Sequence, residues 1–148
     1  MKTYHVDGGA FVEPPEYKFH DAFFTVIDGD GKIVYHNPKI GDIWSGLAEF
    51  EAIRWVVENI KDRPIRITSD CKTAISWARK GSSKKSKFKV RSLSLSGIEL
   101  EYQHGNLADV WNAESHSPKY SKEYYVARWR KAQKDSGRSS SASQGKFL

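Results

Sequence analysis

The sequence contains one cysteine and no long apolar run. Cys71 has no second cysteine with which to form an intramolecular disulfide, a pattern typical of a reducing compartment, so we expect a cytoplasmic protein. No stretch approaches the roughly 18 uninterrupted apolar residues of a transmembrane helix, and we expect no membrane partner. The first residues, MKTYHVDGGA, lack the apolar segment of a secretory signal, so we expect no such signal.

The residues that are present are typical of one folded domain with a basic surface. The 148 residues are 39% apolar and 13% aromatic, which is enough for a hydrophobic core in one domain. The net charge of +6 favours nucleic acid or another anionic surface as a partner. We expect a monomer with a domain over residues 1–134 and a flexible Ser/Gly-rich tail over 135–148.

Hydrophobic periodicity predicts strands first and then alternating helices and strands. Alternation and β-branched or aromatic residues predict strands at 1–10, 22–27, 32–36, 64–69 and 97–104. Helical spacing predicts helices at 45–60, 71–81, 106–116 and 121–134. Ser45 is the predicted N-cap of the first helix, and 12–20, with paired prolines, is a predicted loop. This order predicts an α/β fold with helices packed on a mixed sheet, in which the fourth strand runs parallel to its neighbour.

Four acidic residues lie on elements that such a sheet can bring together. They come from the first strand, the first helix, the end of the fourth strand and the helix after the last strand: Asp7, Glu49, Asp70 and Asp109. Glu49 shares the helix face of Ile53, so we expect it to point toward the sheet, whereas Glu51 lies on the solvated face.

Clustered carboxylates require a compensating cation. Two like unit charges about 4 Å apart repel by about 4 kcal/mol at an effective dielectric constant of about 20. Hard divalent cations with oxygen ligands offset this repulsion, and Mg²⁺ is the usual ion beside phosphates. Two such ions about 3.5–4 Å apart can activate a water and stabilise a leaving oxygen in phosphodiester cleavage. We therefore expect two Mg²⁺ ions, with Mn²⁺ as the alternative.

Four segments of the chain resemble the ribonuclease H family. They are VDGGA (6–10), GLAEFEAI (46–53), ITSDCKTAISWARKG (67–81) and NLADVW (106–111). The third resembles the short bacterial and phage form that lacks a basic protrusion, in which a serine-aspartate pair leads into TAIxW. The resemblance implies a ribonuclease H-like fold, a five-stranded mixed sheet in the order 3-2-1-4-5 flanked by helices. It also implies an endonuclease that hydrolyses the RNA strand of RNA–DNA hybrids.

The same resemblance implies a role for each carboxylate. Asp7 would bridge both metal ions, and Asp70 would hold the ion on the water side. Glu49 would hold the leaving-group side and contact the RNA 2′-hydroxyl, the group that distinguishes RNA from DNA. Asp109 would complete the site, and His104 is a candidate for product release.

Two other functions stay open. One is a nuclease of the same superfamily that acts on DNA, and the other is a catalytically inactive nucleic-acid-binding domain of the same fold. The shortened final segment, EYQHGNLAD (101–109), keeps the second alternative open. Within it, Gly105 stands where the short bacterial form has a further glutamate. Glu114 lies one turn beyond Asp109, and His116 is a weaker candidate.

Each carboxylate also has an explanation without chemistry. Asp7, before two glycines, can be a turn residue, and Asp70 can be an N-cap. Glu49 and Asp109 can be solvated helix residues. If Asp7 instead binds metal, Gly8 and Gly9 can let a substrate backbone approach closely.

Basic residues are concentrated after the helix at 71–81. No acidic residue lies between Arg79 and Arg91. This stretch can be a solvated loop, but its place in a nuclease-like frame favours phosphate contact. The candidates for contact with nucleic acid are Lys72, Lys80, Lys84, Lys85, Lys87 and Lys89. In the helix at 121–134, Tyr125 and Trp129 share a face that we expect to pack on the core rather than stack on bases.

Overall fold

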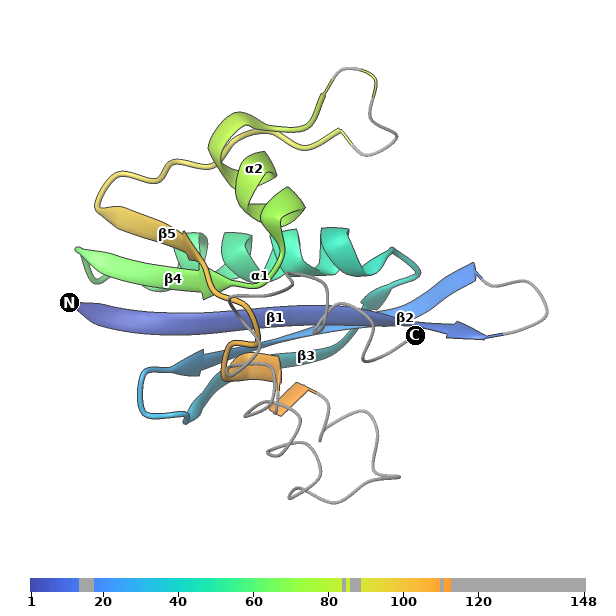
Figure 1. Cartoon of the computed structure of the whole chain (residues 1–148), viewed down its shortest axis with the longest axis horizontal. Helices are drawn as coiled ribbons and strands as arrows, with labels where there is room; N and C mark the ends of the chain where they lie inside the picture. The colour runs from blue at the N-terminus through green and yellow to red at the C-terminus, as the bar shows by residue number, and fades with distance from the viewer. Residues whose placement is uncertain (14–17, 84, 86–88, 110, 113–148) are drawn as a thin grey trace.

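One five-stranded sheet organises the chain. The computed structural model describes residues 1–13, 18–83, 85, 89–109 and 111–112. The strands are β1 (Lys2–Glu13), β2 (Lys18–Asp28), β3 (Ile33–Gly41), β4 (Ile65–Ser69) and β5 (Ile98–Tyr102), and the helices are α1 (Ser45–Asn59) and α2 (Lys72–Lys80). The sheet order is β3-β2-β1-β4-β5 (Figure 1). The predicted order is confirmed, and the chain has an α/β fold with a mixed sheet.

The direction of the strands follows from how they are connected. β1, β2 and β3 are antiparallel neighbours, whereas β4 lies parallel to both β1 and β5. Parallel neighbours need a crossover, which α1 makes before β4 and α2 makes before β5. The predicted parallel placement of the fourth strand is therefore confirmed. Both helices lie on one side of the sheet, and the short turn after β5 lies on the other (Figure 1).

The first hairpin is longer than the periodicity predicts. β1 continues to Glu13 and β2 begins at Lys18, so the predicted loop at 12–20 is wrong at both ends. A register shift between Gly9 and Phe11 lets pairing continue, with Phe11 opposite His20. The Phe11 ring lies 5.4 Å from the ring of Phe23, which gives this extension its own aromatic contact.

The start of α1 also differs from the prediction. Trp44, in an extended conformation, is the N-cap, and Ser45 is already the first helical residue. The cap is made by the backbone, because the Trp44 carbonyl accepts hydrogen bonds from the amides of Leu47 and Ala48 at 3.1 Å. The preference of serine for the cap position therefore did not decide where the helix begins.

The core lies between the sheet and the two helices. Phe50, Ile53 and Val56 of α1 are buried against Ile65 and Ile67 of β4. Burying one such side chain stabilises the fold by about 1.5–3 kcal/mol. This packing presses α1 against β1, which is the contact that places Glu49.

The C-terminal predictions lie largely beyond the residues that the structure describes. Residues 108–109 and 111–112 are helical, as expected for the start of the helix at 106–116. The predicted helix at 121–134 and the tail at 135–148 lie outside the described residues. Among the described helices, none is long and apolar enough to cross a membrane.

Candidate metal centre

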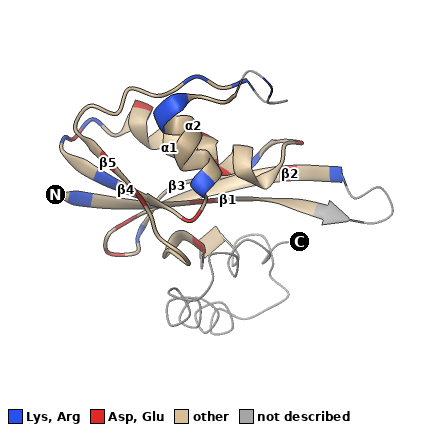
Figure 2. Cartoon of the chain, turned by 45° about the horizontal axis from the view of Figure 1, so that its top comes forward, with Lys and Arg blue, Asp and Glu red and all other residues tan. Residues whose placement is uncertain are grey.

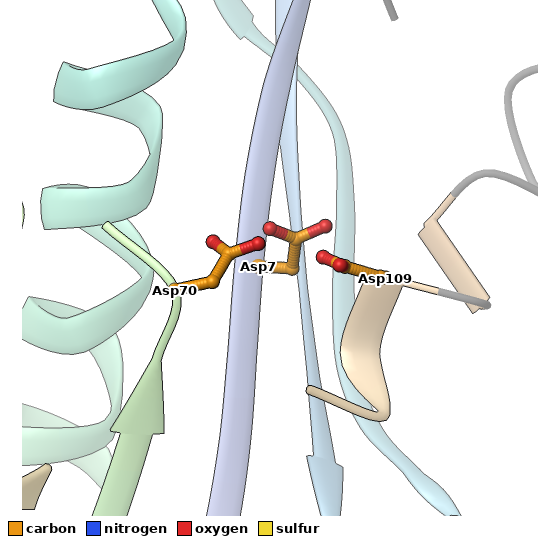
Figure 3. A group of neighbouring side chains, drawn as sticks. All are labelled: Asp7, Asp70 and Asp109. Atoms are coloured by element: carbon orange, nitrogen blue, oxygen red, sulfur yellow. The ribbon is translucent and has the colours of Figure 1, made fainter. Parts of the chain in front are cut away.

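Three aspartates converge from three separate elements. One carboxylate oxygen from each of Asp7, Asp70 and Asp109 lies within 4.8 Å of the others. Asp7 lies between Asp70 and Asp109, with the side chains directed toward one another (Figure 3). All three are buried, with exposed fractions of 0%, 1% and 7%. The described part of the chain therefore brings together three of the four predicted carboxylates.

The parallel pairing of β1 and β4 explains why Asp7 and Asp70 meet. The paired register ends at His5 opposite Thr68, so residues two positions further along each strand continue the same row. Those residues are Asp7 and Asp70. Side chains alternate along a strand, so Asp7 points to the same face as His5, away from α1. The site thus lies where the two strands separate.

Asn106 holds this point of separation. Its Nδ2 donates to the Val6 carbonyl at 2.7 Å and to the Thr68 carbonyl at 3.2 Å. Asn106 is fully buried. The two carbonyls have lost the strand–strand pairing that would otherwise satisfy them, so the amide replaces that pairing. Sequence analysis missed Asn106, although it opens the NLAD segment that contains Asp109.

Asn112 is a second residue that sequence analysis missed. Its Nδ2 donates to Oδ2 of Asp7 at 3.2 Å, and its Oδ1 accepts from the Thr25 hydroxyl at 2.9 Å. Its spacing of three residues from Asp109 places both side chains on one helix face. That spacing was the available signal, but it does not say that the face meets β1 and β2.

Glu49 lies close to this region but outside the group of three. It is buried, as predicted, and Glu51 is partly exposed and paired with Arg54. Glu49 accepts a hydrogen bond from the Ser69 hydroxyl at 3.3 Å. Ser69 precedes Asp70, so Glu49 is connected to the segment that carries one of the three aspartates.

Gly8 explains how α1 approaches β1. A Cβ at this position would lie 2.7 Å from both the Ala48 carbonyl carbon and the Glu49 nitrogen. The space beside Gly8 is filled by the α1 backbone, so the interpretation that Gly8 admits a substrate backbone is wrong. The glycine after Asp7 instead lets the turn carrying Glu49 pack on β1.

The four explanations without chemistry are also wrong. Asp7 lies within β1 opposite Thr25, not in a turn. The N-cap of α2 is Cys71, whose Sγ accepts from the Ala74 amide at 3.4 Å, so Asp70 precedes the cap. Asp109 and Glu49 are buried rather than solvated.

Two titratable groups near the aspartates have shifted pKa values. Burial lowers the pKa of His5, which is therefore neutral at neutral pH. Burial raises the pKa of the Cys71 thiol, and the negative charge of Asp70 raises it further. Ionised carboxylates held this close together repel one another. Their oxygens are the ligand type that hard divalent cations prefer, so the donor set fits Mg²⁺ or Mn²⁺.

The backbone conformation at Gly105 suits glycine better than the glutamate of the short bacterial form. Gly105 has φ of +62°, a left-handed conformation in which a glutamate is strained. His104, beside it, is buried. His104 is not part of the group formed by Asp7, Asp70 and Asp109, and its part in product release stays a prediction. Glu114 and His116 lie outside the described residues.

The basic residues lie on α2 and on the loop that follows it (Figure 2). The loop is closed at its base, since Ser82 and Val90 exchange hydrogen bonds of 2.8 and 2.9 Å. Lys72, Lys80, Lys85 and Lys89 are exposed, whereas Lys84 and Lys87 lie outside the described residues. Lys72, two positions after Asp70, also lies over the ring of Tyr102 at 4.9 Å. Exposed positive charge thus lies on α2, which begins two residues after Asp70, and on the loop that follows it.

Comparisons with known proteins concern the backbone alone. No protein-family model and no curated protein matches this sequence. One similar solved structure is LC11-RNase H1 in complex with RNA/DNA hybrid, with 14% identity and a TM-score of 0.42 over 70% of this chain and 85% of that chain. Another is the native prototype foamy virus protease-reverse transcriptase, with 15% identity and a TM-score of 0.47 over 99% of this chain and 21% of that one. At these values the likenesses carry no argument about activity.

Proposed function

We propose that this chain is a metal-dependent endonuclease that hydrolyses the RNA strand of RNA–DNA hybrids. The observation that carries the proposal is the buried group formed by Asp7, Asp70 and Asp109. The proposal is further supported by the four segments that resemble ribonuclease H, each of which contributes one acidic residue to this region.

The proposed ligands are the three clustered aspartates, with Glu49 as the fourth. Mg²⁺ ions held there, two in number, would supply an activated water and stabilisation of the leaving oxygen. The chain's own part is to hold the carboxylates in place before substrate arrives. Asp7 is held by a central strand, and Asn106 and Asn112 bond to the backbone and side chain around it. Ser69 orients Glu49, which we propose contacts the RNA 2′-hydroxyl.

Cleavage of a substrate panel tests this function. We expect the wild type with Mg²⁺ to cleave an RNA–DNA hybrid in preference to duplex DNA and a DNA junction, and to lose activity when the metal is chelated. Asp7→Asn should abolish cleavage, whereas Asp30→Asn, in the exposed β2–β3 turn, should cleave like the wild type. Preference for duplex DNA would indicate a DNA nuclease of this fold. A wild type without metal-dependent cleavage would indicate a binding domain.

The lysines of the loop after α2 should contact phosphate. Replacing Lys85 and Lys89 by alanine is expected to weaken hybrid binding and to reduce the dependence of log affinity on log salt by up to roughly 0.9 per lost contact. Binding is measured with Asp7→Asn, so that the substrate stays intact. Lys32→Ala, at an exposed lysine in the β2–β3 turn, is the control for loss of one positive charge away from this loop. An unchanged salt slope in the double variant would mean that the loop is only solvated.

A further inference from the structure

We propose that His36, Thr25 and Asn112 form a hydrogen-bond chain that positions the Asp7 carboxylate for metal binding. The inference rests on the proposed function, because it concerns the same three aspartates. None of these three residues is among the predicted site residues. Each acts through the next, so they are positioning residues rather than catalytic ones.

The sheet register places three of the side chains in one row. Asp7 on β1 lies opposite Thr25 on β2, and Thr25 lies opposite His36 on β3. Directly opposed residues of antiparallel strands project to the same face. Asn112 comes from the helical turn after β5 and joins Thr25 to Asp7. The links are 2.8 Å from His36 Nδ1 to Thr25 Oγ1, 2.9 Å from Thr25 Oγ1 to Asn112 Oδ1, and 3.2 Å from Asn112 Nδ2 to Asp7 Oδ2.

The carboxylate at one end decides the direction of every bond. An ionised carboxylate only accepts, so the Asn112 amide nitrogen must face Asp7 and its oxygen must face Thr25. The Thr25 hydroxyl has one proton, which it donates to that oxygen. Thr25 can therefore only accept from His36, which must carry a proton on Nδ1. All three donors thus point along the row toward Asp7.

Burial makes the loss of any link in this hydrogen-bond chain costly. Thr25, Asn112 and Asp7 are fully buried, so a broken link leaves polar groups without water to replace it. Hydrogen bonds in such surroundings strengthen one another. Burial lowers the pKa of the half-buried His36, and both its neutral Nδ1–H form and its protonated form donate from Nδ1. The direction of the chain is therefore kept when His36 changes its charge.

Metal affinity measured without substrate tests the inference. Partners that orient metal ligands typically change metal affinity by about 10–100-fold when removed. Titration calorimetry of the metal-free full chain with Mn²⁺ should therefore show binding weakened by about 10–100-fold in Thr25→Val, which keeps the shape but lacks the hydroxyl. Thr25→Ser keeps the hydroxyl and should bind nearly as tightly as the wild type.

A second pair of variants keeps the test decisive if Thr25→Val does not fold. His36 lies on an edge strand, where substitution is tolerated more easily. His36→Leu should weaken Mn²⁺ binding, whereas His36→Asn, whose amide nitrogen can take the place of Nδ1, should largely restore it. Nitrogen-15 chemical shifts of the wild-type His36 ring should show the proton on Nδ1.

The possible results separate this inference from the function on which it rests. If the wild type binds Mn²⁺ and Thr25→Val or His36→Leu binds it equally well, the chain does not position Asp7, although the proposed function stands. A His36 ring without a proton on Nδ1 would also overturn the proposed hydrogen-bond chain. A wild type that binds no divalent cation would overturn both.

Discussion

Replacing Asp70 by asparagine is expected to stabilise the metal-free protein while removing its response to metal. Its carboxylate has an oxygen within 4.8 Å of those of Asp7 and Asp109. At an effective dielectric constant of about 20, each such pair of charges repels by about 3.5 kcal/mol or more. Protonation and relaxation relieve part of this repulsion, so we expect the free energy of unfolding in chelator to rise by about 1–3 kcal/mol. Denaturant unfolding in the presence of EDTA measures it.

The same variant should behave in the opposite way when Mg²⁺ is added. A cation that binds the folded state alone stabilises it by mass action, so the wild type should gain stability with increasing Mg²⁺. Asp70→Asn lacks one of the three clustered ligands and should gain little. Its cleavage of hybrid should fall by more than about 100-fold, beyond the loss typical of a residue that only orients a ligand.

Asp30→Asn is the matched control for this prediction. It makes the same chemical change at an exposed position, and its stability should stay within about 0.5 kcal/mol of the wild type with or without metal. The three aspartates do not form a metal site if Asp70→Asn is destabilised in EDTA and is stabilised by Mg²⁺ as much as the wild type.

Gly8→Ala is expected to destabilise the fold and to stop cleavage. The added methyl would lie 2.7 Å from two backbone atoms of α1, the Ala48 carbonyl carbon and the Glu49 nitrogen. Overpacking of this kind costs about 1–3 kcal/mol, and we expect the upper part of that range because a helix backbone cannot rotate away as a side chain can. Moving α1 off β1 also moves Glu49. Thermal unfolding and the hybrid cleavage assay measure the two effects.

Gly29→Ala gives the comparison for Gly8→Ala. A Cβ at Gly29 would meet the Thr3 carbonyl oxygen at 3.7 Å, an ordinary contact. Its stability should therefore stay within about 0.5 kcal/mol of the wild type. If Gly8→Ala is as stable as Gly29→Ala, close packing of α1 on β1 is not what the glycine provides.

Part of the candidate site was predictable because buried residues recur at regular spacing along helices and strands. Helical spacing placed Glu49 on the inner face of α1. Strand alternation identified β1, which contains Asp7, and β4, which ends directly before Asp70. That Glu49 joins the three aspartates at one metal site stays a prediction. Periodicity reports which face is buried, but it does not report where a long side chain ends, and the Glu49 carboxylate bonds to Ser69.

The sequence by itself determined the strand and helix order, the inward face of α1 and the acidic residues on three converging elements, because local alternation and spacing record them. Only the tertiary structure decided the rest. Asn112 contacts Asp7 across 105 residues, and Asn106 contacts Val6 across 100. The extension of the first hairpin and the packing of α1 beside Gly8 likewise depend on contacts between separate elements. Such contacts depend on register, on a bulge and on the approach of a helix to a strand, and no local pattern of residue types encodes them.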